Sequence, residues 1–274
     1  MQHTITSNFI NILGKNLYYK SAGAGAAIIL LHPSPLCSNT MLPFINLLAP
    51  HFKVFAIDLP GYGQSQSLQK PIATLANYLP TLHQFITAVT TNPIKIYGTA
   101  TGAQLAIAYS LKYANKVSHT YLDNAAHFTP IQYTKILAHY FPNFEPTANG
   151  SHLQALWQHV ERSCTHFPWY SNAEADRFSH QIPPPHIIQN IVNNYLLAGP
   201  NYADAYKCAF AHERAIHVQN LQTPTTIFNW LGSPIKKYIA QLLAHNFNNN
   251  IKIINTPVAI ADRYLIMLDV MKGI

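Results

Sequence analysis

The 274-residue chain is long enough to bury the core of one large domain, and 49% of its residues are hydrophobic. Its formal charge of +7 reflects a scarcity of acidic residues, because only 10% of the residues are charged and the longest basic run is Lys236-Lys237. Proteins that bind nucleic acid gather their basic residues into a patch or stripe, so no nucleic-acid partner is expected. Three widely spaced cysteines exclude a disulfide framework.

No segment of the sequence suggests a membrane partner. The longest apolar run, residues 26–31 with their flanks, is far shorter than the roughly 20 residues that a membrane-spanning helix needs. The first ten residues lack the charged and apolar parts of a secretory signal. We therefore expect a soluble, cytoplasmic protein that exists as a monomer or homodimer.

The first half of the chain alternates short β-branched runs with longer helical patterns, which is typical of a mainly parallel sheet with helices on both faces. These patterns predict strands at residues 26–31, 53–57, 94–97 and 118–122, and a helix at residues 102–113. Each predicted strand is almost continuously apolar, as strands buried on both faces are.

The second half begins with a different composition. From Phe128 to about Gln219 the chain is rich in His, Pro and aromatic residues and has helical rather than strand patterns. Strand patterns return at 225–230 and 251–255, and a helix is predicted around 262–271. The predicted organisation is a first core part at 1–127, a helical lid at 128–219 and a second core part at 220–274.

Three motifs in the first half resemble those of the α/β-hydrolase fold superfamily, in the same order and spacing. Residues 54–65, VFAIDLPGYGQS, resemble the strand and turn after that family's fourth core strand. Residues 30–35, LLHPSP, stand where the family has a His-Gly oxyanion loop, and residues 96–102, IYGTATG, stand where it has the nucleophile elbow. The resemblance covers essentially the whole chain. It implies an α/β fold with a mainly parallel eight-stranded sheet, flanking helices and an inserted helical lid.

The positions of the family's catalytic triad depart from its pattern. Gly98 and Gly102 of the elbow are present, but Ala100 stands at the nucleophile position, and a methyl group cannot attack a carbonyl. Ser233 stands where the acid after the seventh strand is expected, and residues 256–261 contain no His after the eighth. The chain is therefore similar to a subgroup that lacks the serine and the usual acid and histidine.

An elbow without serine still directs backbone N–H groups at a pocket between sheet and lid, where they stabilise a developing oxyanion. The N–H of Thr101 is one predicted donor. Ser34 is expected to supply the second, through its N–H or its hydroxyl group, because Pro33 has no N–H to give.

Titratable groups near this pocket are the candidates for acid–base chemistry. Asp123 and His127 follow the sixth strand and predict a proton-transfer dyad. A strand-end cap for Asp123 and a lid-hinge position for His127 are the alternatives. His32 is a third candidate, for which a structural role is favoured.

Four lid residues, His152, Trp157, Trp169 and Tyr170, are predicted to line the substrate pocket, because aromatic rings supply rigid apolar area with a polar tip. Packing of the lid on the sheet is the alternative for them. No His spacing predicts a metal site. The glycines at 23 and 25 precede a strand rather than follow one, so no dinucleotide cofactor is expected.

Together these features favour a cofactor-independent, non-hydrolytic enzyme that uses acid–base catalysis on a small apolar carbonyl compound. Elimination, isomerisation, cyclisation and carbon–carbon cleavage all fit that description. Two other functions stay open: a non-catalytic pseudo-hydrolase that binds a small molecule, and a hydrolase with a relocated His/Asp site. Each of the three has a small molecule as its partner.

Overall fold

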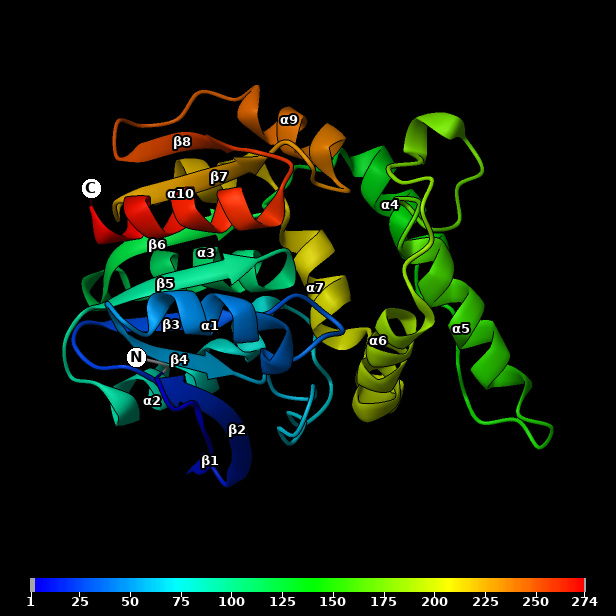
Figure 1. Ribbon diagram of the computed structural model, residues 1–274, viewed down its shortest axis with the longest axis horizontal. Helices are drawn as coiled ribbons and strands as arrows, with labels where there is room; N and C mark the ends of the chain where they lie inside the picture. The colour runs from blue at the N-terminus through cyan, green and yellow to red at the C-terminus, as the bar shows by residue number, and fades with distance from the viewer. Residues whose placement is uncertain (1–2, 274) are drawn as a thin grey trace.

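A twisted eight-stranded sheet forms the centre of the computed structural model, which describes residues 3–273 (Figure 1). The strand order is β1-β2-β4-β3-β5-β6-β7-β8; β1–β2 and β2–β4 are antiparallel, and the other neighbours are parallel. The expected mainly parallel sheet is confirmed. The strands span Thr6–Ile12 (β1), Lys15–Ala22 (β2), Ala27–Leu31 (β3), Lys53–Ile57 (β4), Ile94–Thr99 (β5), Val117–Asp123 (β6), Thr225–Trp230 (β7) and Ile251–Thr256 (β8).

Helices cover both faces of the sheet and extend beyond one end of it. In Figure 1, α1 and α10 lie in front of the sheet, α3 lies behind it, and α4, α5 and α6 project past the carboxyl ends of the parallel strands. The helices span Leu42–Leu48 (α1), Leu79–Val89 (α2), Thr101–Lys112 (α3), Pro130–His139 (α4), Ser151–Ser163 (α5), Pro185–Ala198 (α6), Asp204–His212 (α7), Ala215–Gln219 (α8), Lys236–Leu243 (α9) and Ile260–Lys272 (α10). Across residues 3–273, none of these helices is both long and apolar enough to span a bilayer.

Two apolar layers enclose the sheet, one on each face. In β3, Ile28 and Leu30 belong to the layer that holds the buried side chains of α1 and α10, whereas Ile29 and Leu31 belong to the layer on the α2 and α3 face. All five residues of β3 are buried. The continuous apolar pattern of the predicted strands therefore has a direct cause, since side chains alternate between two covered faces.

The β1–β2 hairpin is the part of the sheet that the strand patterns do not predict. Its turn consists of Leu13 and Gly14, both with positive φ (51° and 76°), as the tight turns of two-residue hairpins require. β1 lies at the edge of the sheet and exposes Phe9. Residues 6–12 are mostly polar, so they lack the continuous apolar run that identifies the buried strands.

Helices α4 to α8 fill the interval between β6 and β7, and their first helix has a strong start signal. Thr129 and Gln132 form a reciprocal capping box, and Pro130 occupies the first turn of α4. From α6 the chain returns through α7, which lies beside the carboxyl ends of the central strands (Figure 1). This return brings lid residues against the turn between β5 and α3.

Candidate functional site

The turn between β5 and α3 holds Ala100 in a conformation that L residues rarely adopt, with φ 49° and ψ −114°. Its N–H donates to the carbonyl oxygen of Asp123 at 3.0 Å. A Cβ at Gly98 would lie 2.0 Å from the carbonyl oxygen of Gly102, and one at Gly102 would lie 2.1 Å from that of Leu31. Both glycines are therefore required by close backbone approach, and the tight elbow geometry expected from the sequence is present.

The predicted oxyanion residues come together beside this turn. Ser34, Ala100 and Thr101 all line one cavity. Thr101 is the first residue of α3, so its N–H has no acceptor within the helix. Pro33 and Pro35 on either side of Ser34 have no N–H, which leaves the Ser34 amide as the backbone donor of this loop.

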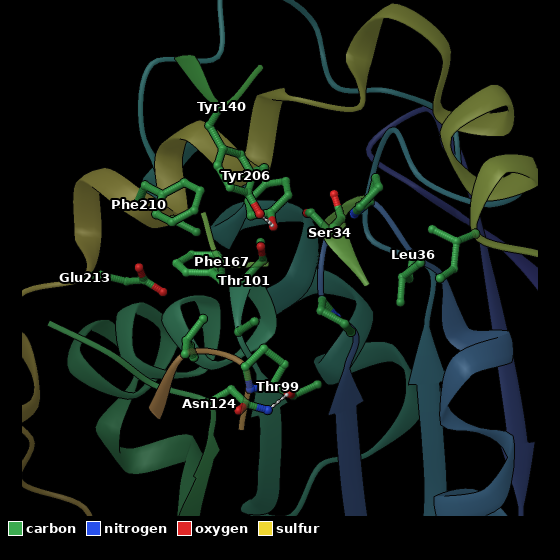
Figure 2. A pocket seen from close by; sticks show the side chains of 18 of the residues that line it. Ser34, Leu36, Thr99, Thr101, Asn124, Tyr140, Phe167, Tyr206, Phe210 and Glu213 are labelled. Carbon is green, nitrogen blue, oxygen red and sulfur yellow. Dashed lines mark hydrogen bonds between the residues drawn. The ribbon is translucent and has the colours of Figure 1, made fainter. Parts of the chain in front are cut away.

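The cavity has a volume of about 440 Å³ and lies between the carboxyl ends of β3, β5 and β6 and the helices of the lid (Figure 2). Ligand sites of open α/β sheets occur at this end of the strands. Aromatic and aliphatic side chains form most of its wall: Phe128, Tyr140, Val160, Phe167, Ile191, Tyr195, Tyr206, Ala209, Phe210, Trp230 and Ile235. Among residues 3–273, no Lys, Arg or His lines the cavity. Size and lining suit a small, largely apolar molecule.

Several polar side chains of the cavity wall bind one another. The hydroxyl groups of Tyr140 and Tyr206 lie 3.0 Å apart, and the Asn124 amide donates to the Thr99 hydroxyl at 3.2 Å (Figure 2). Ser233, at the position of the family's acid, donates to the Asn124 side-chain oxygen at 2.6 Å. Within residues 3–273, no three His, Cys, Asp or Glu side chains converge in an arrangement that could hold a metal ion.

Of the carboxyl groups that the structure describes, one lines the cavity, and it belongs to Glu213, directly after α7. The residue is only 5% exposed, and its Oε2 atom has no hydrogen-bond partner in the described chain. Burial raises the pKa of this carboxyl group to about 8, against the opposing effect of Arg214. Glu213 was not predicted from the sequence, because a Glu-Arg pair at a helix end has the pattern of an exposed helix terminus.

Asp123 faces away from the cavity. Its carboxylate accepts the hydroxyl of Tyr97 at 2.7 Å and forms an ion pair with Arg263 of α10, and both charged residues are buried. The guanidinium group of Arg263 lies 4.7 Å from the ring centroid of Trp230. Asp123 therefore stabilises the packing of α10 on the sheet.

His127 contacts other groups than those expected. Its Nδ1 atom accepts the N–H of Ala215 at 3.0 Å, and its ring centroid lies 4.9 Å from that of His245. It does not line the cavity. The prediction of an Asp123–His127 dyad is therefore wrong. The Asp123 side chain points beneath α10, whereas His127 joins the loop after β6 to α8.

His32 has the structural role favoured from the sequence. The ring is fully buried, accepts the N–H of Leu59 at Nε2 over 2.9 Å, and places Nδ1 3.0 Å from the carbonyl oxygen of Pro33. Burial lowers the pKa of His32, so the neutral ring uses both nitrogens to join the oxyanion loop to the turn after β4. The alternative of a direct catalytic role for His32 is not supported, because His32 does not line the cavity.

The four lid residues predicted to line the pocket lie outside its wall. His152 borders a second cavity of about 210 Å³, and Trp157 packs against the main core. Trp169 donates from Nε1 to the carbonyl oxygen of Tyr140 at 2.9 Å, and Tyr170 packs beside it in the lid cluster. The expectation is corrected, because these rings hold lid segments together and leave the cavity to other aromatic residues.

Comparison with known proteins gives one match to a family model and several partial matches to curated proteins. The model for the alpha/beta hydrolase fold matches residues 26–193. A pimeloyl-[acyl-carrier protein] methyl ester esterase of Pectobacterium atrosepticum is 39% identical over 67 residues, which are 24% of this chain and 26% of that protein. The esterase of Yersinia pestis is 45% identical over 53 residues, 19% and 20% of the two chains. The matches thus span about a quarter or less of these relatives.

Solved structures share the fold over almost the whole chain at low sequence identity. An epoxide hydrolase from Vigna radiata has a TM-score of 0.69 at 14% identity and covers 98% of both chains. A haloalkane dehalogenase from Agrobacterium tumefaciens has a TM-score of 0.64 at 17% identity, with 98% of this chain and 95% of the other covered. A serine hydrolase involved in carbazole degradation has a TM-score of 0.65 at 17% identity, with 98% of each chain covered.

Proposed function

The chain belongs to the α/β-hydrolase fold family, and we propose that it is a cofactor-independent, non-hydrolytic enzyme that acts by acid–base catalysis on a small apolar carbonyl compound. The elbow carries this proposal. Its backbone keeps a conformation that costs about 1–3 kcal/mol, although Ala100 has no group that could attack a substrate. What the turn still supplies is the N–H of Thr101 at the cavity wall.

The proposed chemistry places the substrate's carbonyl oxygen at the N–H groups of Thr101 and Ser34. When a proton leaves the neighbouring carbon, negative charge develops on that oxygen, and preorganised donors stabilise it. Losing one such donor typically slows an enzyme about 10²- to 10³-fold. Elimination, isomerisation, cyclisation and carbon–carbon cleavage can all proceed through this enolate without a covalent intermediate.

The apolar wall of the cavity supports the choice of substrate. Burial of apolar surface contributes about 25 cal/mol per Å², so rings such as Phe167 and Phe210 favour a ligand with little polar surface. The esterases named above match only part of the chain, and Ala100 offers no oxygen to accept an acyl group. Ester cleavage would therefore need a water molecule as the direct nucleophile.

A non-catalytic ligand-binding protein is the second candidate. One observation favours it: no imidazole of the described residues lines the cavity, whereas His is the group that enzymes use most often for proton transfer near pH 7. Such a protein would bind the same small molecules and leave them unchanged.

Isotope exchange distinguishes these functions. The purified protein is incubated in D₂O with small neutral ketones, aldehydes and methyl esters, and NMR follows both the signal of protons next to the carbonyl and the release of methanol. We expect exchange that exceeds the buffer rate for at least one ketone or aldehyde. Binding without exchange would favour the second candidate, and ester cleavage without exchange would favour a hydrolase.

A matched pair of variants places the activity in the cavity. Ala209→Leu adds three carbon atoms to a lining residue of α7, whereas Ala155→Leu makes the same change on the exposed surface of α5. We expect exchange to fall at least about tenfold in the first variant, since the substrate loses space, and to stay at the wild-type rate in the second. Equal rates in both would place the reaction outside this cavity.

A further inference from the structure

We propose that Glu213 is the proton-transfer group of the cavity and that the site takes neutral carbonyl compounds rather than carboxylates. This inference rests on the proposed function, and it names the residue and the charge of the substrate. Glu213 was not among the residues expected to act, and it occupies none of the triad positions of the family's pattern.

The Glu213 side chain can contact a molecule bound in the cavity but is shielded from bulk water. Its carboxyl group lines the cavity and points toward Phe167 and Thr101 in Figure 2. The side chain is nearly inaccessible to bulk water, and Oε2 has no hydrogen-bond partner among residues 3–273. Buried carboxyl oxygens are normally hydrogen-bonded, so the orphaned atom has the environment of a group whose partner is a ligand.

The neighbouring charged and titratable groups do not neutralise this carboxyl group. The guanidinium group of Arg214 donates to the carbonyl oxygens of Phe210 and Glu213 and lies 4.8 Å from the ring centroid of Tyr133. No ion pair to Glu213 occurs in the described part of the chain. Tyr140 at the end of α4 and Tyr206 of α7 are the other titratable neighbours, and burial raises the pKa of each, so both stay uncharged.

This environment suits a general base for carbon acids. Burial raises the pKa of Glu213 to about 8, which makes its carboxylate a stronger base than an exposed glutamate near neutral pH. A ligand carboxylate in this apolar cavity would meet no Lys, Arg or His among the wall residues that residues 3–273 supply. A carboxylate ligand therefore loses its hydration without gaining a cation, and the site selects neutral molecules.

The proposed step is balanced within the cavity. The Glu213 carboxylate takes a proton from the carbon next to the carbonyl group, and the electron pair of that C–H bond forms a carbon–carbon double bond. The carbonyl π pair moves onto oxygen, where the N–H groups of Thr101 and Ser34 stabilise it. Return of the proton to the same carbon gives isotope exchange, and its return to another carbon gives an isomer. The step requires no oxidant or reductant.

Substitution of the carboxyl group tests the assignment. Glu213→Gln keeps the size of the side chain and removes the base, so we expect exchange on the best ketone or aldehyde of the panel to fall at least about 100-fold. Glu161→Gln makes the same change on α5, outside the cavity wall, and should keep the wild-type rate. Glu213→Asp should retain part of the activity. The wild-type rate should rise with pH, reach half of its maximum near pH 8 and level off above that pH.

Ligand binding gives a readout that does not depend on turnover. The melting temperature at pH 7 is measured with a neutral ketone and with a carboxylate of the same carbon skeleton. We expect the ketone, and not the carboxylate, to raise it in both the wild type and Glu213→Gln. Equal stabilisation by the carboxylate would overturn the assigned substrate charge. Wild-type exchange in Glu213→Gln would overturn the catalytic role and leave the proposed function intact. Absence of exchange in the wild type itself would overturn both.

Discussion

Ala100 has a backbone conformation that favours glycine, and its own side chain does nothing to offset the strain. Its φ of 49° and ψ of −114° place it in a region where residues with a Cβ are rare. The conformation persists because Gly98 and Gly102 allow β5 and α3 to approach each other and β3 closely. In a serine hydrolase this strain exposes the nucleophile; in this chain it exposes a methyl group and leaves the backbone N–H of Thr101 in place.

Replacing Ala100 by glycine should therefore raise stability. We expect Ala100→Gly to increase the free energy of unfolding by about 1 kcal/mol, because relief of strain exceeds the greater entropy of glycine in the unfolded chain. Ala155→Gly, on the exposed face of α5, should instead lower it by about 1 kcal/mol. Urea denaturation measures both values. A similar loss in the two variants would mean that the elbow is unstrained.

The sequence allowed some residues of the site to be predicted and not others. Ser34, Ala100 and Thr101 could be placed at one cavity because they belong to motifs with fixed geometry. Glu213 could not, because its burial arises when α7 folds back against the loop after β6, where the N–H of Phe128 donates to the Glu213 carbonyl oxygen at 3.2 Å. No local pattern encodes a contact between segments that lie 85 residues apart.

At the scale of the elements, the buried ion pair between Asp123 and Arg263 links β6 to α10. Strand alternation explains the direction of Asp123, since Tyr121 and Asp123 lie on the same face and Tyr121 belongs to the layer beneath α10. The period of two therefore directs the Asp123 side chain toward α10 and away from the cavity. The sequence did not indicate that Arg263 of α10 would supply the cation, because no local pattern pairs a helix residue with a strand 140 residues earlier in the chain.

Breaking this pair should be strongly destabilising. Arg263→Met leaves a buried carboxylate without its cation, and we expect the free energy of unfolding to fall by about 3–5 kcal/mol. The double variant Asp123→Leu with Arg263→Met should recover at least about half of that loss, because no unpaired charge remains. Denaturation of the single and double variants measures the difference. Additive losses would mean that the two charges do not depend on each other.

At the scale of the whole molecule, most of the sheet could be predicted from the sequence, whereas the roles of the lid residues could not. Six strands were predicted within about two residues of their observed bounds, because burial on both faces gives continuous apolar runs such as that of β3. The lid helices share the same aromatic-rich composition throughout, so the sequence could not distinguish Phe167, which lines the cavity, from Trp169, which bonds to the backbone of Tyr140. Ligand-facing and packing rings differ only in tertiary position.

Burial shifts the pKa values of histidines and of Glu213 in opposite directions, and we expect this to give the whole molecule a stability maximum near pH 6.5. Burial lowers the pKa of His119 and of His159 to about 4 and that of His212 to about 3. Between those values and 6.5, the unfolded state binds more protons, so stability rises with pH. Glu213 acts in the reverse sense: its pKa of about 8 in the folded state means that the folded state binds the extra proton above about pH 4.5, and stability falls as pH rises.

The slope of the free energy of unfolding against pH changes sign near pH 6.5, because the histidines stop contributing above that pH. Below pH 6.5 the histidines with lowered pKa values outnumber the one carboxyl group with a raised pKa, and between pH 6.5 and 8 the effect of Glu213 dominates, with a slope of up to about 1.4 kcal/mol per pH unit. We expect the wild type to lose stability on both sides of pH 6.5, and Glu213→Gln to lose it only on the acid side. Urea denaturation from pH 5 to 9 measures both profiles. Parallel profiles above pH 6.5 would show that Glu213 is already ionised in the folded protein at that pH, and would contradict both its raised pKa and the expected rise of the exchange rate toward pH 8.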